Sequence, residues 1–358
     1  MSGPVVTTYE RVAELPLTIE RHTLEERRRT ISAEFGDRVT TTFHLHGRGE
    51  EGLGEDVTYD PEEHAELQGR AEPLPLEGEW TFGEFSRHVG ALDLFPNTTP
   101  FLTAFLLYRR WAIESAALDL ALRQAGRSLA DVLEREPRPV AFVVSLRLGN
   151  PPSFEPVRRR LEAYPWLRFK LDGTPDWPGE LIEQLVATGA IASIDFKGAY
   201  KGTPVDVDTD PAFYRRIAEA LPDAWLEDPD LTVPEADAAL EPYRDRITWD
   251  APIHSVEDIE RLAFPPRTVN VKPSRFGSVE ALFAGYDHCD ARGIEMYGGG
   301  QSELGVGRGQ IQLLAALFHP DGVNDIAPSG YDWADFPDGL EPSPLDPRPE
   351  PTGMRRRP

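Results

Sequence analysis

The feature that most constrains the fold is a repeat that begins at residue 140. From there, short apolar runs alternate with stretches whose apolar residues recur at helical spacing, which is typical of βα units that build a parallel sheet. Strands are predicted at residues 140–146, 167–171, 191–196, 224–227, 246–250, 268–272, 294–297 and 323–326. Helices are predicted at 178–188, 211–221, 256–262, 278–292 and 309–318. Eight such units close a (β/α) barrel.

The chain before residue 140 has a different pattern. It carries an alternating strand-like piece at 39–46, a turn rich in Gly and Glu at 47–56, and a long helical pattern at 101–125. A chain of 358 residues has room for a barrel of about 200 residues and a smaller partner. We therefore expect an α+β capping domain, a barrel and a tail rich in Pro and Asp, at residues 1–139, 140–330 and 331–358.

Composition restricts the partners and the compartment. The net charge of −24 argues against binding to nucleic acid or to an anionic membrane, because either would need basic patches. Cys289 is the single cysteine, so no intrachain disulfide is expected, and neither an 18-residue apolar run nor a leader pattern is found. These features predict a soluble cytoplasmic protein that acts on a small molecule. They leave homo-oligomerisation open.

Lysine is nearly absent from this chain. Only four of the 37 basic residues are lysines, namely Lys170, Lys197, Lys201 and Lys272. Compositional drift toward arginine explains the scarcity, but arginine cannot replace a lysine that must lose its proton during a reaction. Lys201 lies in a polar loop, where chance survival is at least as good an explanation. Lys170 and Lys272 end predicted strands, which favours a function for both.

Five charged residues end neighbouring predicted strands, and in a barrel the carboxyl ends of the strands share one rim. Lys170, Asp195, Glu227, Asp250 and Lys272 are separated by 25, 32, 23 and 22 residues, about one βα unit each. Three adjacent carboxylates repel one another unless a cation lies between them, and oxygen ligands favour Mg²⁺, with Mn²⁺ as an alternative. The sequence predicts Asp195, Glu227 and Asp250 as metal ligands. Each acid alone has a second interpretation, as a helix cap or an ion-pair partner.

A metal site flanked by two lysines indicates a chemistry. A divalent cation can bind a substrate carboxylate and stabilise the charge that develops when the adjacent carbon loses its proton. Strands two and six lie across the barrel from each other, so Lys170 and Lys272 are expected to face opposite sides of the substrate as catalytic acid and base. That geometry suits racemisation or elimination.

The order of these motifs resembles the enolase superfamily, in its muconate-lactonising enzyme subgroup, along nearly the whole chain. The resemblance rests on Arg-x-Lys, Asp, Leu-Glu-Asp-Pro, Asp, Val-x-Val-Lys-Pro and a glycine-rich segment at 298–305. It implies an α/β protein with a modified TIM (β/α) barrel, a capping domain that sets substrate choice, and magnesium. It further implies a lyase or isomerase that forms a metal-stabilised enolate, similar to o-succinylbenzoate synthase or N-acylamino acid racemase. Glu303 matches the family's glutamate after strand seven, which lines the site.

The sequence departs from the family pattern at two site-lining positions. Arg168 replaces the first lysine of the strand-two motif, which keeps the charge and excludes a role as a base. Lys197 stands where the family usually has asparagine, two residues after Asp195 and therefore on the same face of the strand. Three explanations are equally good: a weaker demand for metal, a substrate with extra negative charge, or pairing of Lys197 with Asp206 or Asp208.

Other interpretations remain open. The barrel could be non-catalytic or metal-free and bind a carboxylate ligand with Lys197, or it could bind phosphate at the glycine-rich loop after strand seven. His44 and His46 share a face of a predicted strand and could supply half of a metal site, but exposed strand histidines are the better explanation. The substrate, and the choice between racemisation, dehydration and cycloisomerisation, cannot be read from the sequence.

Overall fold

The N-terminal part of the chain is a cap built from an antiparallel sheet and helices. The computed structural model describes residues 6–32, 36–203 and 205–357. Three strands pair in the order β2-β3-β4, and a small second sheet pairs β1 with β5. The elements are α1 (Glu10–Ala13), β1 (Pro16–Ile19), β2 (Arg21–Ser32), β3 (Gly36–Gly47), β4 (Glu50–Asp56), α2 (Pro61–Gln68), β5 (Gly78–Thr81), α3 (Phe82–Ala91), α4 (Ala104–Gln124) and α5 (Leu129–Leu133). The strand predicted at 39–46 and the helix predicted at 101–125 are therefore present as β3 and α4.

The backbone of helix α4 packs directly against the backbone of β4, because β4 carries glycine where the two elements meet. A Cβ atom on Gly54 would lie 2.0 Å from the carbonyl oxygen of Ala112, and one on Gly52 would lie 2.1 Å from that of Ala116. Such approach requires the absence of a side chain. The Gly-x-Gly spacing in β4 thus positions the long cap helix α4.

A fully buried arginine holds the cap together internally. Arg109 of α4 donates to a carboxylate oxygen of Asp56 at 2.9 Å and to the carbonyl oxygens of Leu94 at 3.0 Å and Glu63 at 3.1 Å. Arg109 and Asp56 are both without solvent exposure. A buried charge needs such complete pairing, so this network fixes β4, α2 and the segment before α4 against one another.

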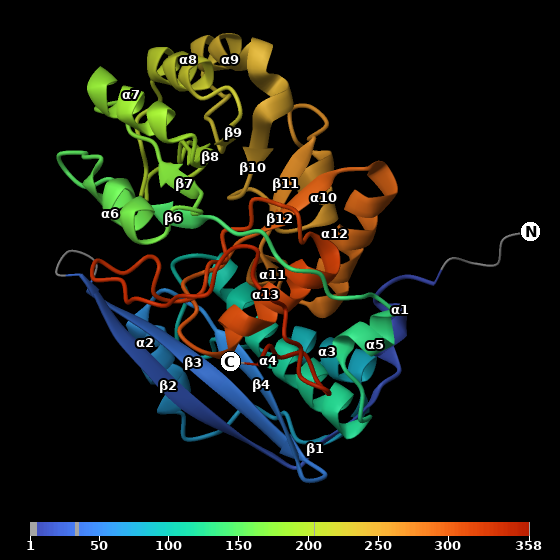
Figure 1. Cartoon of the computed structure of the whole chain (residues 1–358). Coiled ribbons are helices and arrows are strands. Elements are labelled where there is room, and N and C mark those ends of the chain that lie inside the picture. Colours follow the sequence, from blue (N-terminus) through green and yellow to red (C-terminus); the bar gives the residue numbers. More distant parts are fainter. Residues whose placement is uncertain (1–5, 33–35, 204, 358) are drawn as a thin grey trace, which may run out of the picture.

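The C-terminal part contains seven parallel strands in the order β12-β11-β10-β9-β8-β7-β6, which forms the upper part of Figure 1. The strands are β6 (Val144–Leu146), β7 (Phe169–Asp172), β8 (Ile191–Asp195), β9 (Trp225–Glu227), β10 (Ile247–Trp249), β11 (Thr268–Val271) and β12 (Glu295–Gly298). The helices are α6 (Glu155–Ala163), α7 (Gly179–Thr188), α8 (Pro211–Ala220), α9 (Pro234–Leu240), a 3₁₀ helix η1 (Glu241–Arg246), α10 (Val256–Glu260), α11 (Pro273–Phe276), α12 (Val279–Arg292) and α13 (Val306–Phe318). The expected modified (β/α) barrel with an α+β cap is confirmed.

The eighth predicted strand, at residues 323–326, is not a strand in the structure. This segment makes only isolated bridges, from Asn324 to Phe142 and from Asp325 to Gly299. The Asn324 side chain supplies further bonds, since its Oδ1 accepts from the backbone N–H of Gly298 at 2.6 Å and its Nδ2 donates to the carbonyl oxygen of Ala141 at 2.9 Å. The backbone also pairs there, from Val143 N–H to Asn324 O and from Asp325 N–H to Gly298 O, both at 2.8 Å, so backbone and side-chain bonds together close the barrel.

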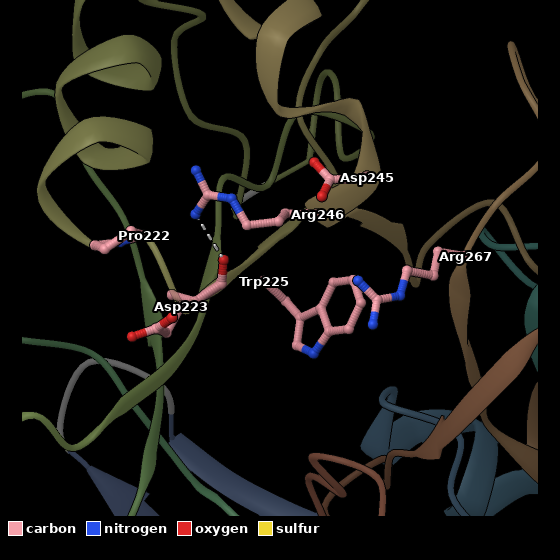
Figure 2. Close-up of a pocket in the computed structure, with 7 residues that line it drawn as sticks. Pro222, Asp223, Trp225, Asp245, Arg246 and Arg267 are labelled. Atoms are coloured by element: carbon pink, nitrogen blue, oxygen red, sulfur yellow. Dashed lines mark hydrogen bonds between the residues drawn. The ribbon is translucent and has the colours of Figure 1, made fainter.

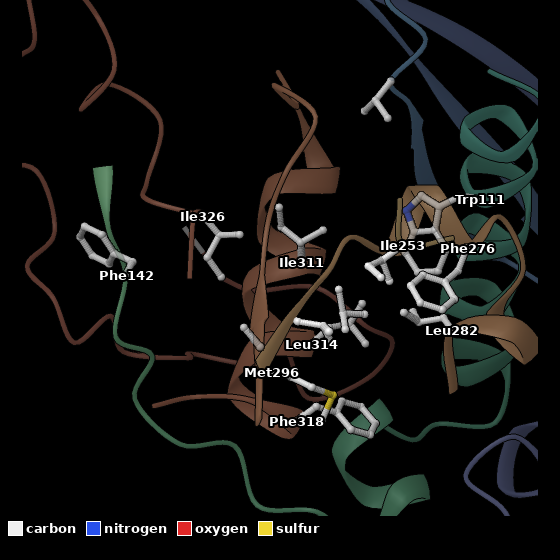
Figure 3. Packing of buried hydrophobic residues seen from close by; sticks show 14 of the residues in the cluster. Trp111, Phe142, Ile253, Phe276, Leu282, Met296, Ile311, Leu314, Phe318 and Ile326 are labelled. Carbon is white, nitrogen blue, oxygen red and sulfur yellow. The ribbon is translucent and has the colours of Figure 1, made fainter. Parts of the chain in front are cut away.

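The cap and the barrel share one apolar core. Figure 3 shows Trp111 of the cap helix α4 beside Ile253 and Phe276 of the barrel, and all three belong to the same buried cluster. The segment after residue 330 also joins this packing, because Tyr331, Leu345 and Met354 are nearly inaccessible to solvent. Among the described helices, none combines the length and the hydropathy that crossing a bilayer requires.

The contact between β4 and α4 can be tested with one added methyl group. Gly54→Ala places a Cβ inside van der Waals contact with α4, and we expect a loss of stability at the upper end of the range of about 1–3 kcal/mol typical of overpacking. The measurement is urea unfolding followed by circular dichroism. Gly179→Ala, at the open start of α7, is the matched control and should leave the midpoint unchanged or slightly higher. Equal midpoints for both variants would contradict the close approach.

Candidate active site

The structure brings the five predicted strand-end residues together at the carboxyl edge of the sheet. Strands β7 to β11 deliver them in sequence order, and β8 and β9 are paired so that Asp195 lies opposite Glu227. All five side chains are buried, including the two lysines, Lys170 at 2% and Lys272 at 6% exposure. Burial of two ammonium groups among carboxylates is rare unless they are paired, so their contacts define the site. The residues are Lys170, Asp195, Glu227, Asp250 and Lys272.

Lys170 contacts three carboxylates. Its Nζ donates to Glu227 and lies 3.4 Å from Asp195 Oδ2 and 3.7 Å from Asp325 Oδ2. Burial alone would lower the pKa of Lys170, but the carboxylates of Glu227 and Asp195 raise it well above its ordinary value. In this arrangement Lys170 is a protonated cation that bridges the ends of β8 and β9.

The best-placed group of metal ligands consists of three carboxylates. Oxygen atoms of Asp195, Glu227 and Asp228 all lie within 4.8 Å of one another. Burial and the nearby carboxylates raise the pKa of Glu227 to about 8, although Lys170 opposes this, and they raise the pKa of Asp228 to about 7. Positive charge between these groups would relieve that repulsion, and an all-oxygen donor set suits Mg²⁺. The residues present therefore fit a hard divalent cation.

Asp250, predicted as the third ligand, lies beside this group and is paired with cations. Lys272 Nζ donates to Asp250 Oδ2 at 2.9 Å, and Arg275 Nη1 donates to Asp250 Oδ1 at 2.9 Å. Burial raises the pKa of Asp250, but Arg275 and Lys272 together bring it far below its ordinary value. Asp228 holds the same loop, because its two carboxylate oxygens accept from the backbone N–H groups of Asp250 at 2.9 Å and Ala251 at 2.8 Å.

Lys197 also places its ammonium group against the cluster. It follows β8 in a left-handed conformation, with φ of 56°, and its Nζ lies 2.5 Å from Asp195 Oδ2 and 3.2 Å from Asp172 Oδ1. Burial lowers the pKa of Lys197, but Asp195 and Asp172 raise it well above its ordinary value. Its acidic neighbours are therefore on the barrel strands, whereas Asp206 lies 3.5 Å from Lys201.

Cationic groups lie among all the acids of the cluster. The buried acids Asp195, Glu227, Asp228 and Asp250 lie among Lys170, Lys197, Lys272 and Arg275, and the partly exposed Asp325 and Asp172 add two further carboxylates beside Lys170 and Lys197. The sequence alone did not indicate that Arg275 and Asp172 belong to the site, or where Asp228 lies in it. The only available signals were Arg275 three residues after Lys272 and the acidic pair at 227–228, and neither indicates which way the side chains point.

The other predicted site-lining residues lie at different depths. Arg168 is exposed and lies just before β7, which begins at Phe169, whereas Lys170 within the strand is buried. Glu303 is buried in the loop between β12 and α13, where its Oε2 lies 3.0 Å from Arg308 Nη2.

One buried carboxylate of the cap binds the loop between β12 and α13. Glu55 of β4 accepts from the backbone N–H groups of Leu304 at 2.7 Å, Gly305 at 3.0 Å and Gly307 at 2.8 Å, at the start of α13. Burial and the nearby Glu303 raise the pKa of Glu55. The contact places the cap over the glycine-rich loop beside the catalytic candidates.

Gly299 in this loop makes room for a catalytic candidate. A Cβ atom on Gly299 would lie 2.4 Å from Cε of Lys272, so the lysine side chain passes directly over the glycine. The glycine-rich segment is thus explained in part by the path of Lys272.

A separate pocket lies at the opposite end of the strands. It is lined by residues that precede or begin β9, β10 and β11, and Figure 2 shows the Trp225 indole there near Arg267, whose guanidinium carbon is 5.6 Å from the ring centroid. Catalytic groups of barrels gather at the carboxyl ends of strands, so this pocket does not belong to the candidate active site.

Comparison with known proteins supports the family and the fold. The o-succinylbenzoate synthase of Bacillus subtilis (strain 168) is 25% identical over 62% of the chain, and the match spans 59% of that enzyme's length. The N-succinylamino acid racemase of Thermus thermophilus is 27% identical over 93% of the chain and 90% of the racemase. The dipeptide epimerase of Methylococcus capsulatus, solved as a complex with a Mg ion, superposes with a TM-score of 0.72 at 19% identity, over 95% of this chain and all of the epimerase.

The fold is that of the enolase superfamily, as predicted from the motif order, since solved members of that superfamily superpose on most of the chain. Within this class, the chain belongs to the family described as domain of unknown function DUF8230. Residues 10–132 match its N-terminal domain and residues 136–333 match its C-terminal domain.

The ammonium group of Lys197 should oppose a divalent cation at Asp195. We expect Lys197→Asn to bind Mg²⁺ at least about tenfold more tightly, a change of about 1.4 kcal/mol, because a like charge leaves the cluster. Isothermal calorimetry of the chelator-treated protein measures this. Lys201→Asn, which removes a half-exposed lysine four residues away, should leave the affinity unchanged. Equal or weaker binding by Lys197→Asn would show that Lys197 does not compete with the metal.

Proposed function

We propose that this protein is a metal-dependent lyase or isomerase that removes the proton alpha to a substrate carboxylate. The observation that carries the proposal is the pair of buried lysines, Lys170 and Lys272, which contact different carboxylates of one buried cluster. The relatives named above, a synthase of o-succinylbenzoate and a racemase of N-succinylamino acids, support a substrate of that kind. A small-molecule carboxylate is therefore the proposed partner.

The proposed metal ligands are Asp195, Glu227 and Asp250, with Asp228 as the alternative third ligand. Asp195 and Glu227 offer buried oxygens that face each other across paired strands. To bind the cation, Asp250 would have to give up its contact with Lys272 or Arg275. Asp228 would have to bind the cation while keeping its two backbone hydrogen bonds. When bound, magnesium supplies positive charge that binds the substrate carboxylate and stabilises the charge formed on proton loss.

The two lysines would carry the proton transfers. While Glu227 and Asp195 pair with it, Lys170 stays protonated. Use of these two carboxylates as metal ligands would offset their negative charge and so lower the pKa of Lys170. Lys272 would likewise be released from Asp250. In a racemase one lysine removes the proton from one face and the other returns a proton to the opposite face. In a dehydratase Lys170 would take the proton and pass it to the departing hydroxide, and Lys272 would stay protonated.

Residues of the cap would enclose the substrate. Tyr59 donates through its hydroxyl to Gln301 Oε1 at 2.8 Å, and Gln301 Nε2 donates to the hydroxyl of Tyr108 at 3.0 Å. These contacts join the cap to the loop that carries Glu303. Closure of this boundary would exclude water from the reacting carbon, which strengthens each electrostatic interaction with the substrate.

One observation favours a second candidate function. Because Lys170, Lys197, Lys272 and Arg275 already offset the buried carboxylates, the cluster could be stable without a metal and bind a carboxylate ligand directly. This metal-free, carboxylate-binding barrel would need no proton transfer.

Magnesium titration separates the two functions. For the proposed enzyme, we expect one Mg²⁺ per chain by calorimetry, and loss of that binding in Asp195→Asn and Glu227→Gln because each removes a charged ligand. Asp250→Asn should weaken binding as strongly, and Asp228→Asn less. Asp208→Asn, an exposed acid in the loop after β8, is the control and should bind normally. Absence of binding by the parent protein would favour the metal-free barrel.

The role of Lys272 can be tested by isotope exchange. An N-succinylamino acid incubated with the protein and Mg²⁺ in D₂O should lose its α-proton signal in the NMR spectrum. Lys272→Ala should slow racemisation of both enantiomers by at least about 100-fold, the usual scale for a lost acid or base. Lys201→Ala should keep full activity. Two-way exchange that survives in Lys272→Ala would exclude this lysine as the second base.

A further inference from the structure

The face of the cap sheet that carries Glu55 also carries a cluster of imidazole and carboxylate groups. Glu25 comes from β2, His44 and His46 from β3, and Glu51 from β4, so all three strands contribute. The register places His46 directly opposite Glu51. The two histidine side chains are only 20% and 21% exposed, which is low for polar groups on a surface sheet.

The side chains of this cluster converge. His44 Nδ1 lies 2.9 Å from Glu51 Oε1, and His46 Nε2 lies 3.8 Å from the same oxygen. One ligand atom from each of His44, His46 and Glu51 lies within 4.8 Å of the other two. Glu25 completes the group, because its Oε2 lies 3.1 Å from His44 Nε2. Sequence inspection found only the two histidines, since Glu25 and Glu51 reach them solely through strand pairing.

Both ring nitrogens of His44 face carboxylate oxygens. A neutral imidazole carries one N–H, yet both ring nitrogens of His44 lie within hydrogen-bonding distance of a carboxylate oxygen. One of the two contacts would then join two acceptors with no hydrogen between them. A cation bound at that nitrogen would relieve the contact.

We propose that His44, His46 and Glu51 form a zinc site on the cap, distinct from the oxygen cluster of the barrel. Two nitrogen donors and one carboxylate are the ligand types that Zn²⁺ takes, and a fourth position would be filled by water. In this site Glu25 accepts the Nε2–H of His44. That bond leaves Nδ1 free to bind the metal, as in the carboxylate–histidine–zinc arrangement.

The surroundings are compatible with a cation. Arg21 lies opposite His46 in the sheet. Arg355 donates to the carbonyl oxygen of Glu51. The carboxylates of Glu25 and Glu51 offset these two arginines. Tetrahedral zinc needs donor separations of about 3.4 Å, so side-chain rotations must lengthen the 2.9 Å contact of His44 with Glu51 and shorten the wider separations, none of which exceeds 4.8 Å.

A metal here would have a structural effect. It would link β3 to β4 directly and β2 through Glu25, at the end of the sheet that the C-terminal segment reaches through Arg355. The site shares no residue with the barrel cluster, so it would stabilise the cap without taking part in the proposed reaction.

Zinc titration in a barrel-site variant tests the proposal. The full chain carrying Glu227→Gln, in excess Mg²⁺, should bind one Zn²⁺ by calorimetry, and Zn²⁺ should raise its thermal midpoint. Adding His46→Gln, which leaves both hydrogen bonds of His44 in place, should remove that binding. Adding Glu25→Gln should weaken it by about 10- to 100-fold, the usual effect of losing such a supporting carboxylate. Co²⁺ should give the visible absorption of a tetrahedral site in the parent and lose it in His46→Gln.

His22→Gln is the matched control, because His22 pairs with Glu77 at 2.9 Å on the same sheet but lies outside the cluster. It should bind Zn²⁺ normally. The thermal midpoint in chelator shows whether each variant is folded, and His44→Gln provides an independent removal of a ligand. The proposal would be overturned if the Glu227→Gln chain bound no zinc. It would also be overturned if zinc binding persisted unchanged in both His44→Gln and His46→Gln.

Discussion

The structure depends on the compensation of buried charge at the carboxyl edge of the barrel. Carboxylates at this depth are costly unless cations or hydrogen bonds accompany them. Lys170, Lys197 and Lys272 provide most of that compensation, each from a different strand end. Removal of one partner would leave an unpaired charge in the interior. The same groups that could perform chemistry therefore also hold the strand ends together.

Much of the fold could be predicted because its signal is local. Seven of the eight predicted strands match, since each is a short apolar run between helical segments. The eighth is reduced to two isolated bridges, and the side chain of Asn324 adds hydrogen bonds there that leave no periodicity in a sequence. The cap was only partly predicted. Half of the twelve residues of its strand β2 are charged, Arg21 and the five residues 25–29, and the strand carries no apolar alternation that would indicate a half-buried strand.

The candidate site was predictable in its members but not in its contacts. Spacing by one βα unit was enough to bring Asp195 and Glu227 together. It could not show that Asp250 would pair with Arg275, because that contact depends on the turn of α11 immediately after Lys272. Nor could the sequence show that Arg168, which lies just before the first residue of β7, would be exposed. In physical terms, strand order is encoded locally, whereas side-chain direction depends on the packed neighbours.

The distribution of lysines gives the molecule an unusual chemical exterior. Lys170 and Lys272 are buried and Lys197 is largely so, which leaves Lys201 as the one half-exposed ε-amine in a chain with 33 arginines. The solvent-facing positive charge is therefore carried almost wholly by guanidinium groups, which stay protonated and do not react as nucleophiles at neutral pH. An amine-directed acylating reagent would meet one target on the outside of the fold, besides the α-amino group. Modification of Lys170 or Lys272 would mark an opening of the buried cluster.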